Sequence, residues 1–269
     1  MYTPLDKAAK AIELLVEGCS VSTVERFTGL HHTTILSLLV LVGEKCGRLL
    51  ESRIRNLPVS DVQCDEIWGF VGCKEKNNVS GEPTRGDAYC FVAIERNTKL
   101  VLSWHLGRRT ARDTFAFTEK INEATQGQFQ ITTDGFKPYF DAVHMSLGTR
   151  VDFAQLVKVY AAPRDGEQRY SPAEVVDTVP LPRWGQPELS RICTSHVERQ
   201  NLTMRMQIRR LTRLTNAFSR KWENLHAALA LYFAWYNYCK FHHTLRSTPA
   251  MAAGITDHIW SITELLEAV

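Results

Sequence analysis

The sequence contains 269 residues, of which 44% are hydrophobic and 10% aromatic, and its formal net charge at pH 7 is +3. A chain of this size can bury a substantial core in one medium domain with a small appendage. No secretory signal pattern is present, and the longest apolar runs are shorter than the roughly 20 residues of a membrane span. We therefore expect a globular, cytoplasmic protein with no membrane partner.

The seven cysteines are scattered and include no C-x-x-C pair. Zinc sites and disulfide frameworks both need cysteines at characteristic spacings. The sequence therefore predicts neither of them.

The N-terminal region shows helical spacing of apolar residues in three segments between Asp6 and Val42, separated near Gly18 and Gly29. Glycine suits the tight turn of a helix-turn-helix, in which "HHTTILSLL" would be the recognition helix. Its first residues are short polar groups suited to phosphates or base edges, namely His31, His32, Thr33 and Thr34. A three-helix packing unit without a DNA role fits the pattern equally well. We expect a helix-turn-helix DNA-binding domain over residues 1–48 and a linker over 49–60.

The middle of the chain alternates strand and helix signals. The segments "DVQCDEIWGFVG", "AYCFVAIE" and "LVLSWHLG" predict three strands, because they are rich in Val, Ile and aromatic residues and are separated by turn residues. A helix over 111–124, the strand "QFQITTD", a helix over 137–147 and the strand "FAQLVKVYA" follow. The order β-β-β-α-β-α-β is that of the RNase H-like fold, whose first and fourth strands are neighbours. The predicted fold class is α/β, an RNase H-like mixed sheet flanked by helices and preceded by an all-α helix-turn-helix domain.

Residues 163–190 are rich in proline, glycine and charge, which predicts an irregular insertion rather than a packed element. Helices resume near Arg191 and again in "KWENLHAALALYFAWYNYC". We expect the RNase H-like catalytic domain to extend over 61–249 with this insertion inside it, and a C-terminal tail helix to occupy 250–269.

Three acids far apart in the sequence meet at one edge of the sheet in this topology. Asp65 lies inside the first strand, Asp134 ends the fourth strand before Gly135, and Glu198 lies on the helix after the insertion. Carboxylates brought together in this way are the hard oxygen ligands that two Mg²⁺ ions need for phosphodiester chemistry, with Mn²⁺ as a substitute. Asp134 alone would also suit a turn or a helix cap. The sequence predicts a two-metal site at this edge.

The helix that carries Glu198 is strongly basic, since the segment 191–221 contains eight Lys and Arg against this single acid. At 100° per residue, Arg205 and Arg209 share the face of Glu198, whereas His196 points away from it. Cations beside a metal ligand suit a phosphate-binding groove. A solvated basic face is the alternative, although the positions three and four residues after Glu198 hold no cation. The predicted DNA contacts on this segment are Arg199, Asn201, Arg205, Arg209 and Arg213.

The segments "CDEIWGFVGCKEKN", "TTDGFKPY", "TSHVERQNLTMRMQIRRLTR" and "YNYCKFHHTLRSTPAMAAGI" resemble the bacterial DDE transposases of the insertion-sequence-one type. Together with "HHTTILSLLVLVGEKC" the resemblance covers nearly the whole chain. It implies that Asp65, Asp134 and Glu198 are the catalytic triad of an RNase H-like domain behind a helix-turn-helix. Relatives often carry paired C-x-x-C motifs of a zinc ribbon, which this sequence does not contain.

The resemblance implies a DNA transposase that hydrolyses a phosphodiester at transposon ends and transfers the 3′-hydroxyl into target DNA. Its partners would be double-stranded DNA and at least one further copy of the chain, because two ends must be joined, and it would be nucleoid-associated in the cytoplasm. Two alternatives stay open. One is a non-enzymatic helix-turn-helix regulator with a degenerate catalytic domain, and the other is a structure-specific RNase H-like nuclease.

Overall fold

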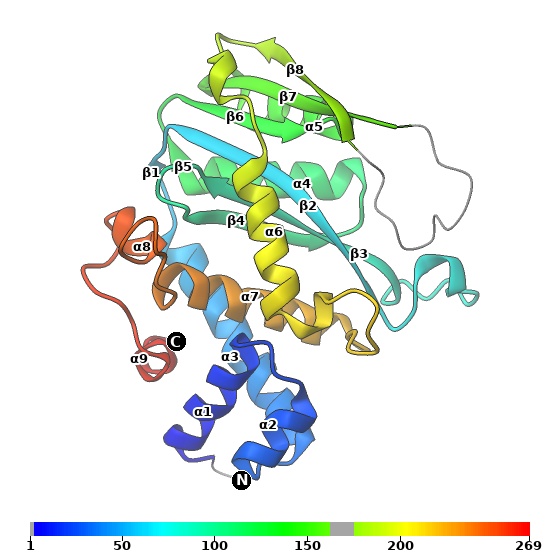
Figure 1. Cartoon of the computed structure of the whole chain (residues 1–269), viewed down its shortest axis with the longest axis vertical. Coiled ribbons are helices and arrows are strands. Elements are labelled where there is room, and N and C mark those ends of the chain that lie inside the picture. The colour runs from blue at the N-terminus through cyan, green and yellow to red at the C-terminus, as the bar shows by residue number, and fades with distance from the viewer. Residues whose placement is uncertain (1–2, 162–174) are drawn as a thin grey trace.

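The computed structural model describes residues 3–161 and 175–269. Within these residues, six strands form one mixed sheet in the order β4-β3-β2-β6-β7-β8. Helices flank the sheet, and the N-terminal helices extend from one end of it (Figure 1). This arrangement is a mixed α/β structure that is consistent with an RNase H-like fold.

The predicted order of strands and helices is confirmed. Strands β2 (Asp61–Val71), β3 (Gly86–Glu95) and β4 (Val101–Gly107) form an antiparallel meander. After helix α4 (Ala111–Ala124), strand β6 (Phe129–Asp134) pairs in parallel with β2. Helix α5 (Pro138–Ser146) then leads to strand β7 (Val151–Tyr160), which pairs in parallel with β6. The first and fourth predicted strands are therefore neighbours, as expected.

Helices cover both faces of the sheet. Phe91 of β3 contacts Phe117 of α4 and Tyr139 of α5, with ring centroids 5.5 Å and 6.5 Å apart. On the opposite face, Trp104 of β4 packs against Phe233 of helix α7 (Trp222–Tyr238), and helix α6 (Ser195–Gln207) lies across β2 (Figure 1). Burying aromatic and aliphatic side chains between these layers is the main stabilising contribution to the fold.

Residues 175–184 of the predicted irregular insertion form a strand, which corrects the prediction for these residues. Strand β8 (Val175–Trp184) pairs antiparallel with β7 at the edge of the sheet. Most of its side chains are exposed, and it contains Pro180 and Pro182. Because β8 is joined to the sheet mainly through its backbone, its sequence lacks the alternating apolar pattern of a half-buried strand. Residues 163–174 of the predicted insertion lie outside the described residues.

The N-terminal region consists of helices α1 (Leu5–Val16), α2 (Val21–Thr28) and α3 (His32–Arg53). Gly29, which ends α2, has φ 69°, so the left-handed backbone of the turn into α3 suits glycine. Helix α3 continues to Arg53, so the predicted linker is wrong for residues 49–53, and its remainder includes the short strand β1 (Leu57–Pro58), paired with β5 (Thr125–Gln126).

Helix α3 also packs closely on α7, where a side chain at Gly43 would collide with Ala227. A pattern read along one helix does not show such a partner, because the partner lies far away in the sequence. The predicted domain boundary at residue 48 therefore falls inside a helix.

The C-terminal region is dominated by α7, whose side chains are nearly all buried. It is followed by the short helices α8 (Pro249–Ala252) and α9 (Ile262–Ala268), so the predicted tail helix over 250–269 is in fact two short helices with a loop between them. Single-turn 3-10 helices complete the described structure: η1 (Glu75–Asn77), η2 (Gly148–Arg150), η3 (Leu189–Arg191) and η4 (Arg209–Leu211). In the described part of the chain, no helix combines the length and apolar character needed to cross a membrane.

Candidate active site

Two carboxylates meet at one edge of the sheet because of the register between β2 and β6. The parallel pairing ends at Cys64 and Thr133, and the next residue on each strand is an acid, Asp65 or Asp134. Strand β6 ends at Asp134, and Gly135 follows it. The structure thus brings together two of the three acids that the sequence predicts for this site.

Glu66 is the third member of this group, and the sequence reasoning missed it. One carboxylate oxygen from each of Asp65, Glu66 and Asp134 lies within 4.8 Å of the other two, and we call these residues the acid cluster. Consecutive strand residues point to opposite faces, which argues against a shared site for Asp65 and Glu66. The cluster forms where β6 ends, so no further residue of β6 separates Glu66 from Asp134. Two adjacent acids within a strand that is otherwise rich in apolar residues are the signal that could have indicated Glu66.

Arg109 lies beside the acid cluster and also was not predicted. Its Nη2 atom is 3.5 Å from Oδ2 of Asp134 and 3.8 Å from Oε2 of Glu66. The guanidinium group is 4.1 Å from the centroid of the Phe136 ring, which holds it in a cation–π contact. Arg109 therefore offsets part of the negative charge of the cluster from its solvent side.

Two hydrogen bonds fix the orientation of the aspartates. Nδ2 of Asn201, on α6, donates to Oδ2 of Asp65 at 2.9 Å, and the backbone N–H of Phe136 donates to Oδ1 of Asp134 at 3.0 Å. Asn201 is 9% exposed, so it lies beside the acid cluster and not on the surface where a predicted DNA contact would be expected.

Two buried oxygens of this region lack a hydrogen-bond partner among the described residues. They are Oε1 of Glu66 and Oδ1 of Asn201. A buried oxygen without a partner is unfavourable. Hard oxygen atoms in such a position are the donors that Mg²⁺ prefers, so the residues present fit a divalent metal ion.

Glu198, the third predicted acid, lies near the acid cluster but is paired with a cation. Nζ of Lys158, on β7, is 2.7 Å from Oε1 of Glu198, and the Thr194 hydroxyl donates to the same oxygen. Glu198 is close enough to raise the pKa of both Asp65 and Asp134. The structure thus places Glu198 next to the cluster, in an ion pair that no pattern on α6 could reveal.

Burial and mutual repulsion perturb the titration of the acid cluster. Burial, and next the charge of Asp134, raise the pKa of Asp65 to about 6. The same two causes raise the pKa of Glu66, while Arg109 opposes the rise. Burial also raises the pKa of Asp134, against the Phe136 N–H and Arg109. Three crowded carboxylates disfavour their own charged forms, and a bound cation would relieve that repulsion.

The basic segment differs from the predicted continuous helix. Helix α6 ends at Gln207, and Arg209 lies on η4, so the helical wheel does not apply to Arg209 and its shared face with Glu198 is a wrong prediction. The regular helix stops before Ile208, whose backbone is extended. The side chains of Ile208 and Leu211 are both buried. Thr212 Oγ1 then donates to the carbonyl oxygen of Arg205, which satisfies one of the acceptors left free at the helix end.

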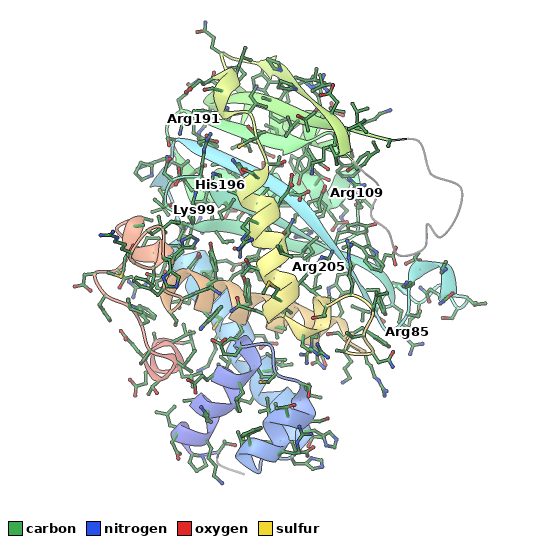
Figure 2. All side chains as sticks on the ribbon, viewed as in Figure 1. Arg85, Lys99, Arg109, Arg191, His196 and Arg205 are labelled. Carbon is green, nitrogen blue, oxygen red and sulfur yellow. The ribbon has the colours of Figure 1, made fainter. Side chains whose placement is uncertain are left out.

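The predicted DNA-binding arginines have different surroundings. Arg199, Arg209 and Arg213 are exposed. Arg205 instead turns inward, and its Nη1 and Nη2 donate to the carbonyl oxygens of Leu211 and Trp68 at 3.0 Å and 3.2 Å. Arg205 therefore connects the end of α6 to β2 (Figure 2).

His196 lies away from Glu198, as the helical wheel predicts. Its Nδ1 atom is 3.0 Å from Nζ of Lys99, at the turn between β3 and β4. Figure 2 shows this pair on the other side of α6 from Arg109. Burial, and next the charge of Lys99, lower the pKa of His196.

The start of α3 is exposed at His31, His32 and Thr33, whereas Thr34 is half-buried. The His31 side chain accepts a hydrogen bond from the backbone N–H of Thr33 and caps the helix. Oε1 of Glu25, on α2, accepts the N–H of His32 at 2.9 Å. The first turn of α3 is therefore held in place with polar side chains facing solvent.

The sequence matches no protein-family model and no curated protein. Among solved structures, the chain is similar to a piggyBac transposase in a synaptic complex with hairpin DNA, determined by cryo-EM, with a TM-score of 0.43 and 12% sequence identity. The alignment covers 99% of this chain and 72% of that chain. A likeness this distant carries no argument about function.

Proposed function

We propose that this chain is a DNA transposase of the DDE type, which hydrolyses a phosphodiester at a transposon end and transfers the freed 3′-hydroxyl into target DNA. The observation that carries the proposal is the convergence of Asp65, Glu66 and Asp134 at the ends of neighbouring strands, with Glu198 alongside. Crowded, half-buried carboxylates of raised pKa are typical of a cation-dependent site. The order of strands, in which the first and fourth are neighbours, agrees with this proposal.

The acid cluster would hold Mg²⁺, with Mn²⁺ as a substitute. It would hold two ions if the Glu198 side chain leaves its ion pair with Lys158 and becomes a further ligand. When bound, the metal supplies Lewis-acid stabilisation of charge on the phosphodiester and on the attacking oxygen. Asn201 keeps Asp65 oriented through its hydrogen bond, and the Phe136 N–H does the same for Asp134. Such support is needed because in-line attack tolerates little displacement of the reacting groups.

Double-stranded DNA is the proposed substrate. Exposed Arg199, Arg209 and Arg213 would contact backbone phosphates, which fix position without specifying sequence. The first turn of α3, from His31 to Thr34, would contact base edges as the recognition helix of a helix-turn-helix over residues 1–48. Joining two ends requires at least two active sites, so we propose that the chain acts as a dimer or a larger oligomer, associated with the nucleoid.

The test supplies the purified chain with duplex DNA carrying the sequences that flank its coding region, with a plasmid as target, in Mg²⁺ or Mn²⁺. The expected result is cleavage of the flanking DNA and covalent joining of its 3′ end to the plasmid, both absent in Asp134→Asn. Lys7→Gln, an exposed cation on α1, is the matched control and should retain both steps.

The same assay separates the competing functions. Cleavage without joining would indicate a structure-specific nuclease and would contradict the proposal. Sequence-specific binding with neither step would indicate a non-enzymatic regulator and would also contradict it. His32→Ala and Thr33→Ala should weaken binding to the flanking DNA more than binding to random duplex, and an equal loss on both would show that α3 does not read base edges.

A further inference from the structure

A cavity of about 550 Å³ lies between the end of β2 and the segment from η4 to residue 218. Its walls include Trp68 and Phe70 of β2 and Phe218 of the loop before α7. The helix-turn-helix and the acid cluster do not contribute to its lining. Cavities of several hundred cubic ångströms can enclose one small organic group.

The aromatic side chains of this cavity form a connected platform. Trp68 and Phe70 point to the same face of β2, with ring centroids 5.8 Å apart, and the centroid of Phe218 is 4.8 Å from that of Phe70. All three rings are half-buried, so part of each faces the cavity. Such rings are the surfaces on which nucleic-acid bases stack without regard to sequence.

Cations surround the aromatic platform. Lys74 lies with Nζ 5.7 Å from the centroid of the Trp68 ring. Arg205, Arg210 and Arg213 also line the cavity, and no Asp or Glu does so among the described residues. Burial, and next the charge of Arg213, lower the pKa of Arg205 to about 10. The cavity is therefore electropositive.

Arg210 is the most informative of these cations. Burial is the one cause that lowers its pKa, and no carboxylate in the described part of the chain pairs with it. A half-buried guanidinium group without an anion is unfavourable. Its planar donors suit a phosphate group.

The cavity lies at a fixed distance from the acid cluster along one strand. Trp68 is three residues beyond Asp65 on β2, which corresponds to about 10 Å at the usual rise of a strand. That span is covered by about three nucleotides at most, because one strand of B-form DNA advances about 3.4 Å per nucleotide and an unstacked strand advances further. A DNA strand cut at the acid cluster could therefore reach this cavity with a nearby nucleotide.

We propose that this cavity holds an unstacked nucleotide of single-stranded DNA within about three nucleotides of the cut phosphate, with its base on Trp68 and Phe70 and its phosphate on Arg210. The proposal rests on the proposed function, because it takes the acid cluster as the position of the cut. It adds a substrate feature that a cleavage site alone does not require: a locally unpaired strand.

The test measures binding of a fluorescent oligothymidine, without metal, by anisotropy. A second oligonucleotide of the same length carries abasic residues, which keep the phosphates but remove the bases. Trp68→Ala should weaken binding of oligothymidine about tenfold, the usual contribution of one stacked base, and should leave the abasic strand nearly unaffected. Trp68→Phe should restore most of the affinity. Arg210→Gln should weaken binding of both strands.

Phe241→Ala removes an exposed aromatic ring outside the cavity and serves as the matched control. Thermal melting of each variant identifies a loss caused by misfolding, and Trp68→Leu, which keeps an apolar side chain but removes the aromatic face, should show the loss expected of Trp68→Ala if Trp68→Ala does not fold. Unchanged affinity in Trp68→Ala, or an equal loss on both strands, would overturn the proposal. The proposal would also be overturned if the wild type and Trp68→Ala showed the same preference for oligothymidine over duplex DNA.

Because these measurements need no metal and no cleavage, they are independent of the proposed reaction. Normal binding with no strand transfer would contradict the transposase proposal and leave the cavity assignment in place. Strand transfer without stacking at Trp68 would contradict the cavity assignment and leave the transposase proposal in place.

Discussion

The two halves of strand β2 create opposite electrostatic environments within a few residues. Asp65 and Glu66 contribute to the acid cluster, whereas Trp68 and Phe70 face a cavity lined by cations. In the first region half-buried carboxylates repel one another, and in the second a half-buried guanidinium group has no carboxylate partner among the described residues. The difference indicates that one region suits a cation and the other an anion. A metal ion and a DNA strand, bound side by side, would satisfy both.

The largest expected effect comes from neutralising one carboxylate of the acid cluster. Asp134→Asn should slow strand cleavage about 1000-fold, or about 4 kcal/mol in activation free energy, because the neutral amide cannot hold the metal as a carboxylate does. Single-turnover cleavage of flanking DNA measures the rate, and near-wild-type DNA affinity shows that the fold persists. Cleavage within tenfold of the wild type would remove Asp134 from the active site.

A pH titration without metal should expose the repulsion in the cluster. The pKa of Asp65 is raised from 3.8 to about 6, so the folded state binds more protons than the unfolded state between these values. The free energy of unfolding should therefore fall as the pH rises from about 4 to about 6, by up to about 3 kcal/mol. Asp65→Asn should lack this part of the fall in urea titrations. Identical pH profiles for the two proteins would contradict the assigned repulsion.

The anchoring of α6 beside the cavity can be tested at Arg205. Its hydrogen bonds to the carbonyl oxygens of Leu211 and Trp68 predict that Arg205→Ala lowers the free energy of unfolding by about 2 kcal/mol. Arg209→Ala is the matched control, since Arg209 is exposed, and should change stability by less than about 0.5 kcal/mol. Equal stabilities in urea would show that Arg205 is not a structural anchor.

Substitution of Glu66 tests whether the metal site has four acids or only the predicted triad. Glu66→Gln should weaken Mn²⁺ binding about tenfold, which is about 1.4 kcal/mol, because one oxygen ligand loses its charge. Calorimetric titration of the DNA-free protein gives the affinity without relying on activity. Glu188→Gln, at an exposed glutamate outside the cluster, is the control. An unchanged affinity would leave Asp65, Asp134 and Glu198 as the complete ligand set.

The smallest expected effect concerns the rim of the cavity. Arg213→Ala should weaken binding of duplex DNA only a few-fold and should reduce the salt slope by about one, the signature of one lost phosphate contact. Its exposed position at the cavity supports this expectation. DNA affinity measured over a series of salt concentrations, with Lys7→Gln as the control, provides the test. A slope equal to that of the wild type would place Arg213 away from the DNA backbone.

Local patterns were sufficient for much of the fold. The apolar and aromatic runs of β2, β3 and β4, and the turn residues between them, predicted the meander correctly, because strands covered on both faces are rich in apolar residues along most of their length. Helix α4 was also predicted with its observed bounds. The β8 prediction failed for the opposite reason, since a strand that is largely exposed does not need such a continuous apolar run.

The sequence alone determined the placement of Asp65 and Asp134 at one edge, because the predicted order of elements makes the first and fourth strands neighbours and each acid directly follows the last residue of their pairing. The tertiary structure decided the rest of the site. Glu66 enters the cluster where β6 ends, Arg109 reaches it from the segment before α4, and Lys158 on β7 pairs with Glu198. These contacts join residues far apart in the chain, and their side-chain directions depend on packing that no single segment specifies. The end of α6 at Gln207 has the same origin, because burial of Ile208 and Leu211 against the rest of the protein outweighs the helical propensity of the segment.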